Sequence, residues 1–333
     1  MDAGGAQLDE DPTDRPSTHT NFAPTRIASP MSHESSYTSP SAFRRALTDK
    51  LRALAVTSRW TVHQLQRQMA YDRLLERLYL VDDDWIVKGA TALLARNLGV
   101  RATIDVDVFR AVTQEVAEAD LREAARRDIG DWFRFDVGPT RPVSDGAAGT
   151  RFPVTAFLGA SEWALFHVDL VGSDLRMTGE PEAMPPLAPV MMPEVAQHGY
   201  RVYPLVDHVA DKVAAILERH GDGGRPSTRF KDLVDLVAII TGASVDAEQQ
   251  KMALSSEAER RGLILPDHFA VPDREIWERG YAREAQRSLL PIAHSLDDAL
   301  EIARAFVDPL LDIEGTATGT WDPQGLHWGS PIA

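Results

Sequence analysis

Apolar side chains recur at helical spacing in two parts of the chain. Within 41–80 they return every three to four residues, which predicts two or three amphipathic helices. Arginines fall between these apolar positions, and we expect them to form a solvated face, with an RNA-binding surface as the alternative. After Pro204 the helical spacing returns and predicts helices at 205–219, 230–240, 248–260, 275–288 and 296–306.

The middle of the chain has the two-residue period of β-strands. Residues 104–109 alternate between apolar and acidic side chains, which predicts a strand with one acidic face. Further strands are expected at 85–87, 132–137, 152–158 and 164–171, helices at 90–98 and 114–127, and a long connection at 172–199. This order predicts an α+β fold with a mixed β-sheet core, N-terminal helices and a helical C-terminal region.

Four segments follow from this pattern. Residues 1–40 are rich in Ser, Thr, Pro, Asp and Gly, and we expect a disordered tail because few apolar side chains are available for burial. An α/β domain with basic N-terminal helices is expected at 41–204, a helical domain at 205–313 and a C-terminal tail at 314–333. The sequence does not decide whether translation starts at Met1 or at Met31.

Charge is distributed unevenly along the chain. The 35 Lys and Arg residues face 50 Asp and Glu residues, for a formal net charge of −15, which argues against a protein that coats nucleic acid indiscriminately. Only 41–110 is basic, at +4, while 1–40 carries −4 and 111–333 carries −15. A basic face formed by this segment could therefore still recognise one RNA end.

Composition narrows the class of protein further. The chain has no cysteine, which excludes disulfides, thiol catalysis and cysteine-ligated metal sites. No apolar run approaches the length of a transmembrane helix, and the first residues have no secretory signal pattern. We therefore expect a cytoplasmic enzyme with no membrane partner.

Three aspartates form the candidate site. Asp105 and Asp107 are two residues apart on a predicted strand, so both carboxylates leave the same face. Asp169 interrupts the apolar strand 164–171 and needs a partner or a metal there. If the two strands are neighbours, the carboxylates converge on a site for two Mg²⁺ ions. Gly89, between a strand and a helix, would let the backbone approach a phosphate.

Four motifs in this order resemble the AbiEii/AbiGii-type nucleotidyltransferase toxins, within the DNA polymerase β-like nucleotidyltransferase superfamily. They are Lys-Gly-x-x-Ala-Leu from Lys88, Arg-x-Thr-x-Asp-x-Asp from Arg101, Asp-Lys-x-x-Ala from Asp211, and Arg-x-Lys-Asp-x-x-Asp-Leu from Arg229. The resemblance implies that 41–204 holds the nucleotidyltransferase domain. Ala90 departs from the family, which usually has Gly or Ser there, and it offers no hydroxyl to a phosphate.

The resemblance also implies an activity. The chain would transfer a nucleoside monophosphate from an NTP to an acceptor hydroxyl, which the resemblance places at the 3′ end of tRNA. The reaction would release pyrophosphate and block translation. Asp105, Asp107 and Asp169 would bind Mg²⁺ and form the catalytic site, with Lys88, Gly89, Ala90 and Thr103 beside the nucleotide. A cognate antitoxin would be the protein partner.

The later motifs keep alternatives open. Lys212 lies beside an apolar helix stripe, where a lysine commonly extends toward water, whereas the resemblance assigns it to the triphosphate. Asp232 and Asp235 share one helix face. They either form a salt bridge with Arg229 or Lys231, or act in the site by orienting Lys212, accepting from the base or ribose, or serving as general base. The resemblance favours Asp232 as catalytic and places Asp235 at the nucleotide. Thr103 either simply favours a strand or lies close to the phosphates.

Two other functions remain possible from the sequence. The same fold modifies small molecules or proteins with nucleotides, and the basic segment 41–110 favours RNA over these acceptors only modestly. A catalytically degenerate binding module is the second alternative. The three aspartates argue against it, because a binding module has no need of three acids suited to a metal.

Overall fold

The computed structural model describes residues 37–142, 149–172, 175–193, 195–221, 223–312 and 316–329, all within the compact unit Ser32–Ala333. The expected disordered tail at 1–40 lies outside the described residues except for its last four, and so does the choice between Met1 and Met31.

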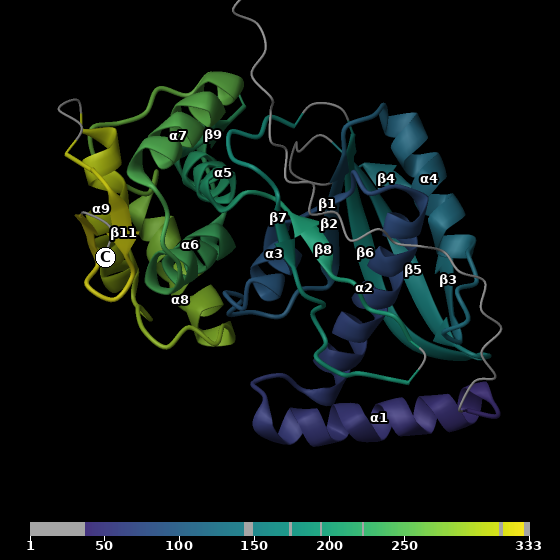
Figure 1. Ribbon diagram of the computed structural model, residues 1–333. Helices are drawn as coiled ribbons and strands as arrows, with labels where there is room; N and C mark the ends of the chain where they lie inside the picture. Colours follow the sequence, from purple (N-terminus) through teal and green to yellow (C-terminus); the bar gives the residue numbers. More distant parts are fainter. Residues whose placement is uncertain are drawn as a thin grey trace, which may run out of the picture. The chain divides into compact units, whose positions relative to one another are not determined.

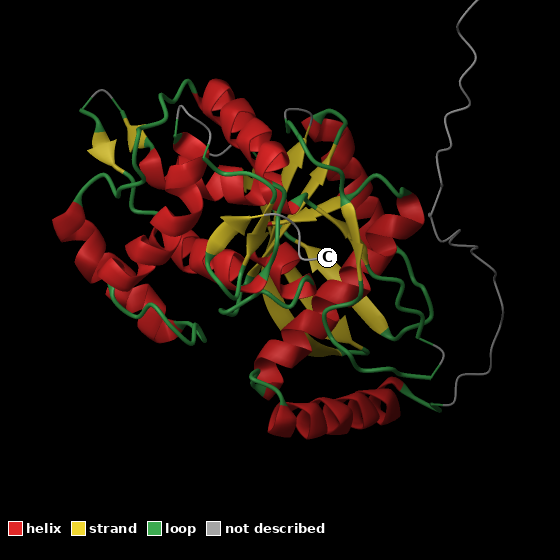
Figure 2. Ribbon diagram, turned by 60° about the vertical axis from the view of Figure 1, so that its left-hand side comes forward, coloured by secondary structure: helices red, strands yellow, loops and turns green. Residues whose placement is uncertain are grey.

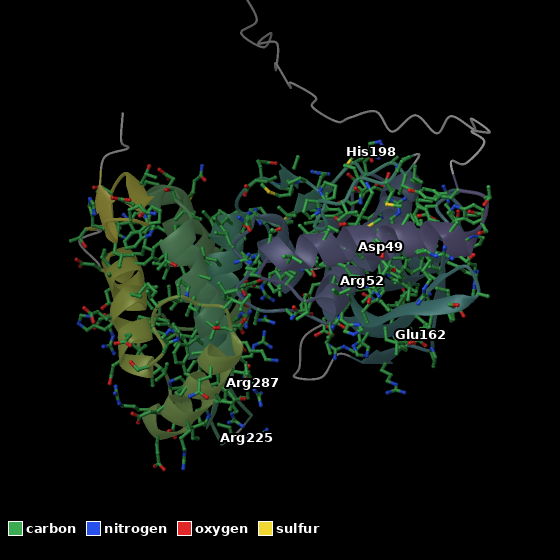
Figure 3. The ribbon with its side chains drawn as sticks, turned by 90° about the horizontal axis from the view of Figure 1, so that it is seen from below. Asp49, Arg52, Glu162, His198, Arg225 and Arg287 are labelled. Atoms are coloured by element: carbon green, nitrogen blue, oxygen red, sulfur yellow. The ribbon has the colours of Figure 1, made fainter. Side chains whose placement is uncertain are left out.

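Two helices account for the helical spacing of 41–80, as predicted. Helix α1 (Pro40–Thr57) is capped by the Ser39 hydroxyl and buries apolar residues at every fourth position. Helix α2 (Val62–Val81) begins with a capping box in which Thr61 and Gln64 each bond the other's backbone N–H. Asp49 and Arg52 lie on the outer side of α1 and form a surface ion pair of 3.2 Å (Figure 3).

One mixed sheet forms the centre of the α/β part. Its strands are β1 (Ile86–Lys88), β2 (Asp105–Arg110), β3 (Phe133–Val137), β4 (Arg141–Pro142), β5 (Thr150–Leu158), β6 (Ser161–Gly172), β7 (Glu182–Met184) and β8 (Tyr200–Val202). Their order is β3-β5-β6-β2-β1-β8-β7, and β4 pairs with β5. The pairs β2–β6 and β1–β8 are parallel, whereas the other pairs are antiparallel. The predicted mixed sheet is therefore confirmed.

Helices cover one face of this sheet. Helices α2 and α4 (Gln114–Arg126) pack on β6, and α1 contacts both α2 and β5 (Figure 1). The strands send alternate apolar side chains to the resulting core, which include Phe152, Val154, Phe166, Val168 and Leu170. The polar residues between them point to the opposite face, which carries the candidate site.

A second core lies among the C-terminal helices. These are α5 (Leu205–Leu217), α6 (Phe230–Gly242), α7 (Ala247–Arg261), α8 (Arg274–Arg287) and α9 (Leu296–Leu311). Each lies where the helical spacing predicted a helix, and Figure 2 shows the helices in red beside the yellow strands of the large sheet. Leu93, from α3 (Gly89–Ala95), and Val100 join this core and connect it to the α/β part.

The expected connection at 172–199 and the expected C-terminal tail at 314–333 both contain strands. Strand β7 lies within 172–199 and pairs with β8, which begins directly after this segment. Strand β8 also pairs with β1 through Val202 and Val87. In the tail, β11 (Thr320–Asp322) and β12 (His327–Gly329) form a hairpin, and Trp321 is 1% exposed against Phe306. A further two-stranded sheet joins β9 (Arg219–His220) to β10 (Arg225–Pro226). Strands of two or three residues are too short to show an alternating pattern.

Two arginines expected on a solvated face are instead internal. Arg73 and Arg77 are 1% and 0% exposed and pair with Asp131 at 2.6 and 2.7 Å. Arg77 also donates to the backbone carbonyls of Arg73, Arg127 and Phe133. The prediction of a solvated face is wrong for these two positions because their remaining donors find partners inside the fold.

Candidate functional site

The three predicted aspartates lie on neighbouring strands. Strands β2 and β6 are parallel, with Asp107 opposite Asp169 and Asp105 opposite His167. The expectation that these strands are neighbours is confirmed. Alternate residues of a strand share a face. The three carboxylates and the His167 imidazole therefore lie together on the sheet face opposite to the hydrophobic core.

Asp107 carries charge that its neighbours do not offset. Burial, followed by the nearby charges of Asp169 and Asp105, raises the pKa of Asp107 to about 6, against the opposing influence of Lys88 and Arg101. Among the described residues, none donates a hydrogen bond to its carboxylate. Asp107 is thus the carboxylate of the site most in need of a positive partner.

Arg151 already holds the third carboxylate. It lies on β5 opposite Asp169, and its Nε and Nη2 donate to the two Asp169 oxygens at 2.7 and 2.6 Å. The Arg151 Nη2 also lies 3.5 Å from Asp105 Oδ1, and His167 Nδ1 lies 3.2 Å from the same oxygen. Asp105 and Asp169 therefore share one guanidinium.

The turn at Gly89 fits closely against Asp107. Strand β1 ends at Lys88 and α3 begins at Gly89, whose φ is +58°, a conformation that L residues with side chains rarely adopt. A Cβ added at this position would overlap the Asp107 carboxylate. No side chain of the preceding residue caps α3. The glycine thus allows the backbone to pass directly beside the carboxylates, and the buried Ala90 follows it.

Two further predicted residues lie at the end of β1 and just before β2. The Lys88 ammonium lies 3.6 Å from Asp211 Oδ2 and 4.2 Å from the centre of the Tyr203 ring. The buried Thr103 precedes β2, donates to the Asp105 carbonyl at 2.9 Å and accepts from its N–H at 3.1 Å. Thr103 therefore fixes the start of the strand that presents Asp105.

Lys212 is the centre of a buried charge network. Its ammonium lies 3.0 Å from Asp232 and 2.9 Å from Asp235, and the residue is 5% exposed. Burial works to lower its pKa, but Asp235 and Asp232 outweigh burial and raise it. Arg101 donates to both Asp235 oxygens at 3.0 and 2.9 Å. The network therefore joins α5 and α6 to the segment that precedes β2.

Asp232 has both of the partners that the sequence left open. It accepts from Lys212, and its second oxygen accepts from Arg229 at 2.7 Å. Burial raises its pKa, but Lys212 and then Arg229 dominate and the pKa is lowered. Asp232 is thus ionised in the folded protein and is bonded to two cations.

The donor set fits a divalent cation at two of the three positions. Carboxylate oxygens are the ligands that Mg²⁺ prefers, and Asp107, beside Asp105, forms no ion pair or hydrogen bond with the side chain of any residue in the described ranges. Asp169 is engaged by Arg151 instead. In the part of the chain that the structure describes, no group of three or more His, Cys, Asp or Glu residues is arranged as a metal site. Asp105 and Asp107 are therefore the residues that fit Mg²⁺ as the side chains stand.

Sequence reasoning gave no role to Arg151 or Arg101. Arg101 belongs to the motif that contains Asp105 and Asp107, which was the available signal. Arg151 alternates with the apolar Phe152 and Val154 on β5, so its face was predictable, whereas its partner depended on the pairing of β5 with β6.

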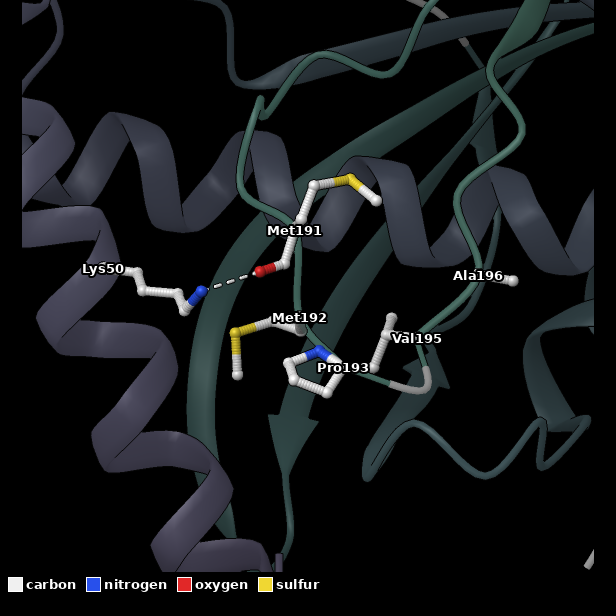
Figure 4. Close-up of a pocket in the computed structure, with 6 residues that line it drawn as sticks. All are labelled: Lys50, Met191, Met192, Pro193, Val195 and Ala196. Atoms are coloured by element: carbon white, nitrogen blue, oxygen red, sulfur yellow. Dashed lines mark hydrogen bonds between the residues drawn. The ribbon is translucent and has the colours of Figure 1, made fainter. Parts of the chain in front are cut away.

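A shallow, open surface pocket of about 630 Å³ lies apart from these residues. It is lined by residues of α1 and of the segment after β7, namely Lys50, Met191, Met192, Pro193, Val195 and Ala196 (Figure 4). The Lys50 ammonium donates to the Met191 carbonyl there at 3.0 Å. None of the predicted site residues lines this pocket.

No helix in the described ranges is long and apolar enough to span a membrane.

A comparison with protein-family models agrees with the motifs. A family model described as "Nucleotidyl transferase AbiEii toxin, Type IV TA system" matches residues 73–302, a range that includes all of the predicted site residues. No curated protein sequence matches the chain.

Among solved structures, JHP933 from Helicobacter pylori is 16% identical to this chain with a TM-score of 0.41. The match covers 73% of this chain and 90% of JHP933. The nucleotidyltransferase toxin MenT4 from Mycobacterium tuberculosis is 17% identical with a TM-score of 0.46, and the match covers 79% of this chain and 97% of that one. Because the family model spans most of the chain, this protein belongs to the AbiEii family of nucleotidyltransferase toxins.

Proposed function

We propose that the chain transfers a nucleoside monophosphate from an NTP to the 3′-terminal hydroxyl of tRNA, with release of pyrophosphate. The observation that carries the proposal is the placement of Asp105 and Asp107 beside the Gly89 turn in a chain of this family. A nucleotide added to the end of tRNA would prevent aminoacylation and stop translation.

Mg²⁺ is the proposed cofactor, with two ions in the complete site, and Asp105 and Asp107 would hold the first. The bound ion would offset the charge of the carboxylates and of the triphosphate. Gly89 allows the backbone to approach the phosphates, with Lys88, Ala90 and Thr103 around it. Asp169 completes the site and accepts the proton of the attacking hydroxyl.

Lys212 supports the phosphates from the other side. An ammonium has three donors, and Asp232 and Asp235 engage two of them, so one remains for a phosphate oxygen. Asp232 keeps the ammonium charged and oriented, which is its proposed catalytic contribution. Asp235 fixes both Lys212 and Arg101 at the nucleotide.

The proposed partners follow from the family. A cognate antitoxin protein would neutralise the toxin, and tRNA would be its target in the cytoplasm. No membrane partner is proposed.

Labelled nucleotides test the proposal. The protein is incubated with Mg²⁺, total RNA and each α-labelled NTP in turn, and the products are separated by size. The control variants are Asp105→Ala with Asp107→Ala, which remove the carboxylates, and Asp136→Asn, which changes an exposed aspartate on β3 of the same sheet. Label in tRNA with the unmodified protein and with Asp136→Asn, but not with the double variant, is the expected result.

The acceptor atom is tested separately. Periodate converts the terminal 2′,3′-diol of tRNA into a dialdehyde, so oxidised tRNA should take up no label. Label in protein or in small molecules would replace tRNA by another acceptor. The absence of label in every fraction would contradict an active transferase.

A further inference from the structure

Arg151 differs from Arg73 and Arg77, the buried arginines that bind Asp131. Arg73 and Arg77 are buried and bonded to backbone carbonyls as well as to Asp131. The Arg151 side chain is 29% exposed, and within the described ranges its guanidinium has polar contacts only with the carboxylates of Asp169 and Asp105. It can therefore leave these partners for water without leaving a buried donor behind.

The guanidinium lies where it competes with a metal ion. The guanidinium donates a bidentate pair of hydrogen bonds to both Asp169 oxygens, and its Nη2 lies 3.5 Å from Asp105 Oδ1. A divalent cation bound by Asp105 and Asp169 together would share these oxygens with the guanidinium, and two positive charges a few ångströms apart repel each other. An arginine guanidinium stays protonated at every accessible pH, so the positive charge of Arg151 is permanent.

We propose that Arg151 is a built-in counter-cation that neutralises Asp169 and Asp105 in the metal-free protein and is displaced when a divalent cation binds all three carboxylates. The identity of the cation rests on the proposed function. Arg151 acts through Asp169 and Asp105 and is a positioning residue: it keeps the acidic strands together and lowers the affinity of the site for metal until the cation arrives.

Direct metal binding tests the proposal without any reaction. Mn²⁺, a spectroscopic substitute for Mg²⁺, is titrated into the full chain without nucleotide, and free Mn²⁺ is followed by electron paramagnetic resonance. Because Arg151→Gln removes the competing charge and the charge-assisted bonds, it should bind Mn²⁺ roughly tenfold more tightly than the unmodified protein. Arg134→Gln removes an exposed arginine on β3 that pairs with Asp136, and it should leave the affinity unchanged.

Two further measurements separate competition from a folding defect. Arg151→Lys keeps the charge but loses the bidentate hydrogen bonding to Asp169. Its Mn²⁺ affinity should therefore lie between those of the unmodified protein and Arg151→Gln. In EDTA, Arg151→Gln should melt at a lower temperature than the unmodified protein, and Mn²⁺ should raise its melting temperature by more.

Two outcomes would overturn the proposal. One is equal Mn²⁺ affinity for Arg151→Gln, Arg134→Gln and the unmodified protein, which would mean that the cation uses Asp105 and Asp107 while Arg151 stays in place. The other is the absence of Mn²⁺ binding to any of them. A shifted affinity with no nucleotide transfer to any acceptor would instead support Arg151 as the counter-cation while contradicting the proposed function.

Discussion

Replacing Asp107 by asparagine should make the metal-free protein more stable at neutral pH. The carboxylate is flanked by Asp169 and Asp105, and no described residue donates a hydrogen bond to it. Asn has nearly the same size and carries no charge, so Asp107→Asn removes the repulsion without leaving a cavity. The site would gain stability at the expense of metal binding.

The size of the effect follows from the pKa. In the folded protein the pKa of Asp107 is about 6, whereas an ordinary aspartate has a pKa of about 4. Two pKa units correspond to about 3 kcal/mol of unfolding free energy, and partial contact with water reduces the expected gain to about 2 kcal/mol. For a chain of this size that gain raises the melting temperature by a few degrees.

The gain should depend on pH in one direction. Below about pH 4 Asp107 is protonated in both the folded and the unfolded chain, so the variant has no advantage. Between pH 4 and pH 6 the unfolded chain releases its proton first, and the stability of the unmodified protein therefore falls relative to Asp107→Asn. Above pH 6 the difference has its full size.

Urea unfolding in EDTA, followed by tryptophan fluorescence from pH 4 to pH 8, measures this difference. Asp136→Asn is the matched control, because the Asp136 side chain is 58% exposed and its replacement should change the unfolding free energy by less than about 0.5 kcal/mol. Equal stability of Asp107→Asn and the unmodified protein at pH 7.5 would refute the reasoning. So would an advantage that persists unchanged at pH 4.

Three more substitutions probe the neighbouring structure. Gly89→Ala should lower the unfolding free energy by about 1–2 kcal/mol and weaken NTP binding, because a Cβ overlaps Asp107 and the backbone has a positive φ; urea unfolding and nucleotide titration measure both. Lys212→Met should cost about 3–5 kcal/mol in urea unfolding, because it leaves two buried carboxylates of α6 without their shared cation. Arg77→Met should lower thermal stability by a similar amount, about 3–5 kcal/mol, because Asp131 keeps only one of its two arginines.

Each of these expectations has a contrary outcome. Full NTP affinity in Gly89→Ala would mean that the backbone does not approach the phosphates there. An unchanged urea midpoint for Lys212→Met would contradict the buried network. A thermal transition of Arg77→Met that matches the unmodified protein would show that Asp131 is already satisfied by its remaining partner.

The sequence predicted those parts of the site that depend on local periodicity. Asp105 and Asp107 share a face because alternate residues of any strand do, and the turn at Gly89 follows from the change of period on either side of it. Placing Asp169 beside them required a second step, namely that an acid within an apolar strand needs a partner. The pairing of β2 with β6 confirms that step.

Contacts that depend on register or on distant segments were not predictable. Arg151 meets Asp169 because of the pairing between β5 and β6, which the alternating pattern does not determine. Arg101 and Asp235 are 134 positions apart in the sequence. The helical spacing of α2 also missed its buried arginine Arg77, because α2 is enclosed around most of its circumference and a buried arginine has the same spacing as an exposed one.

The long-range ion pairs have a consequence for biosynthesis. On the ribosome, Arg101 emerges well before its partner Asp235, and Lys212 emerges before Asp232 and Asp235. Until α6 has been translated, the growing chain carries these cations without the carboxylates that hold them in the folded protein. The charge network around Lys212 can therefore form only late in synthesis, and a nascent or truncated chain that ends before α6 lacks it.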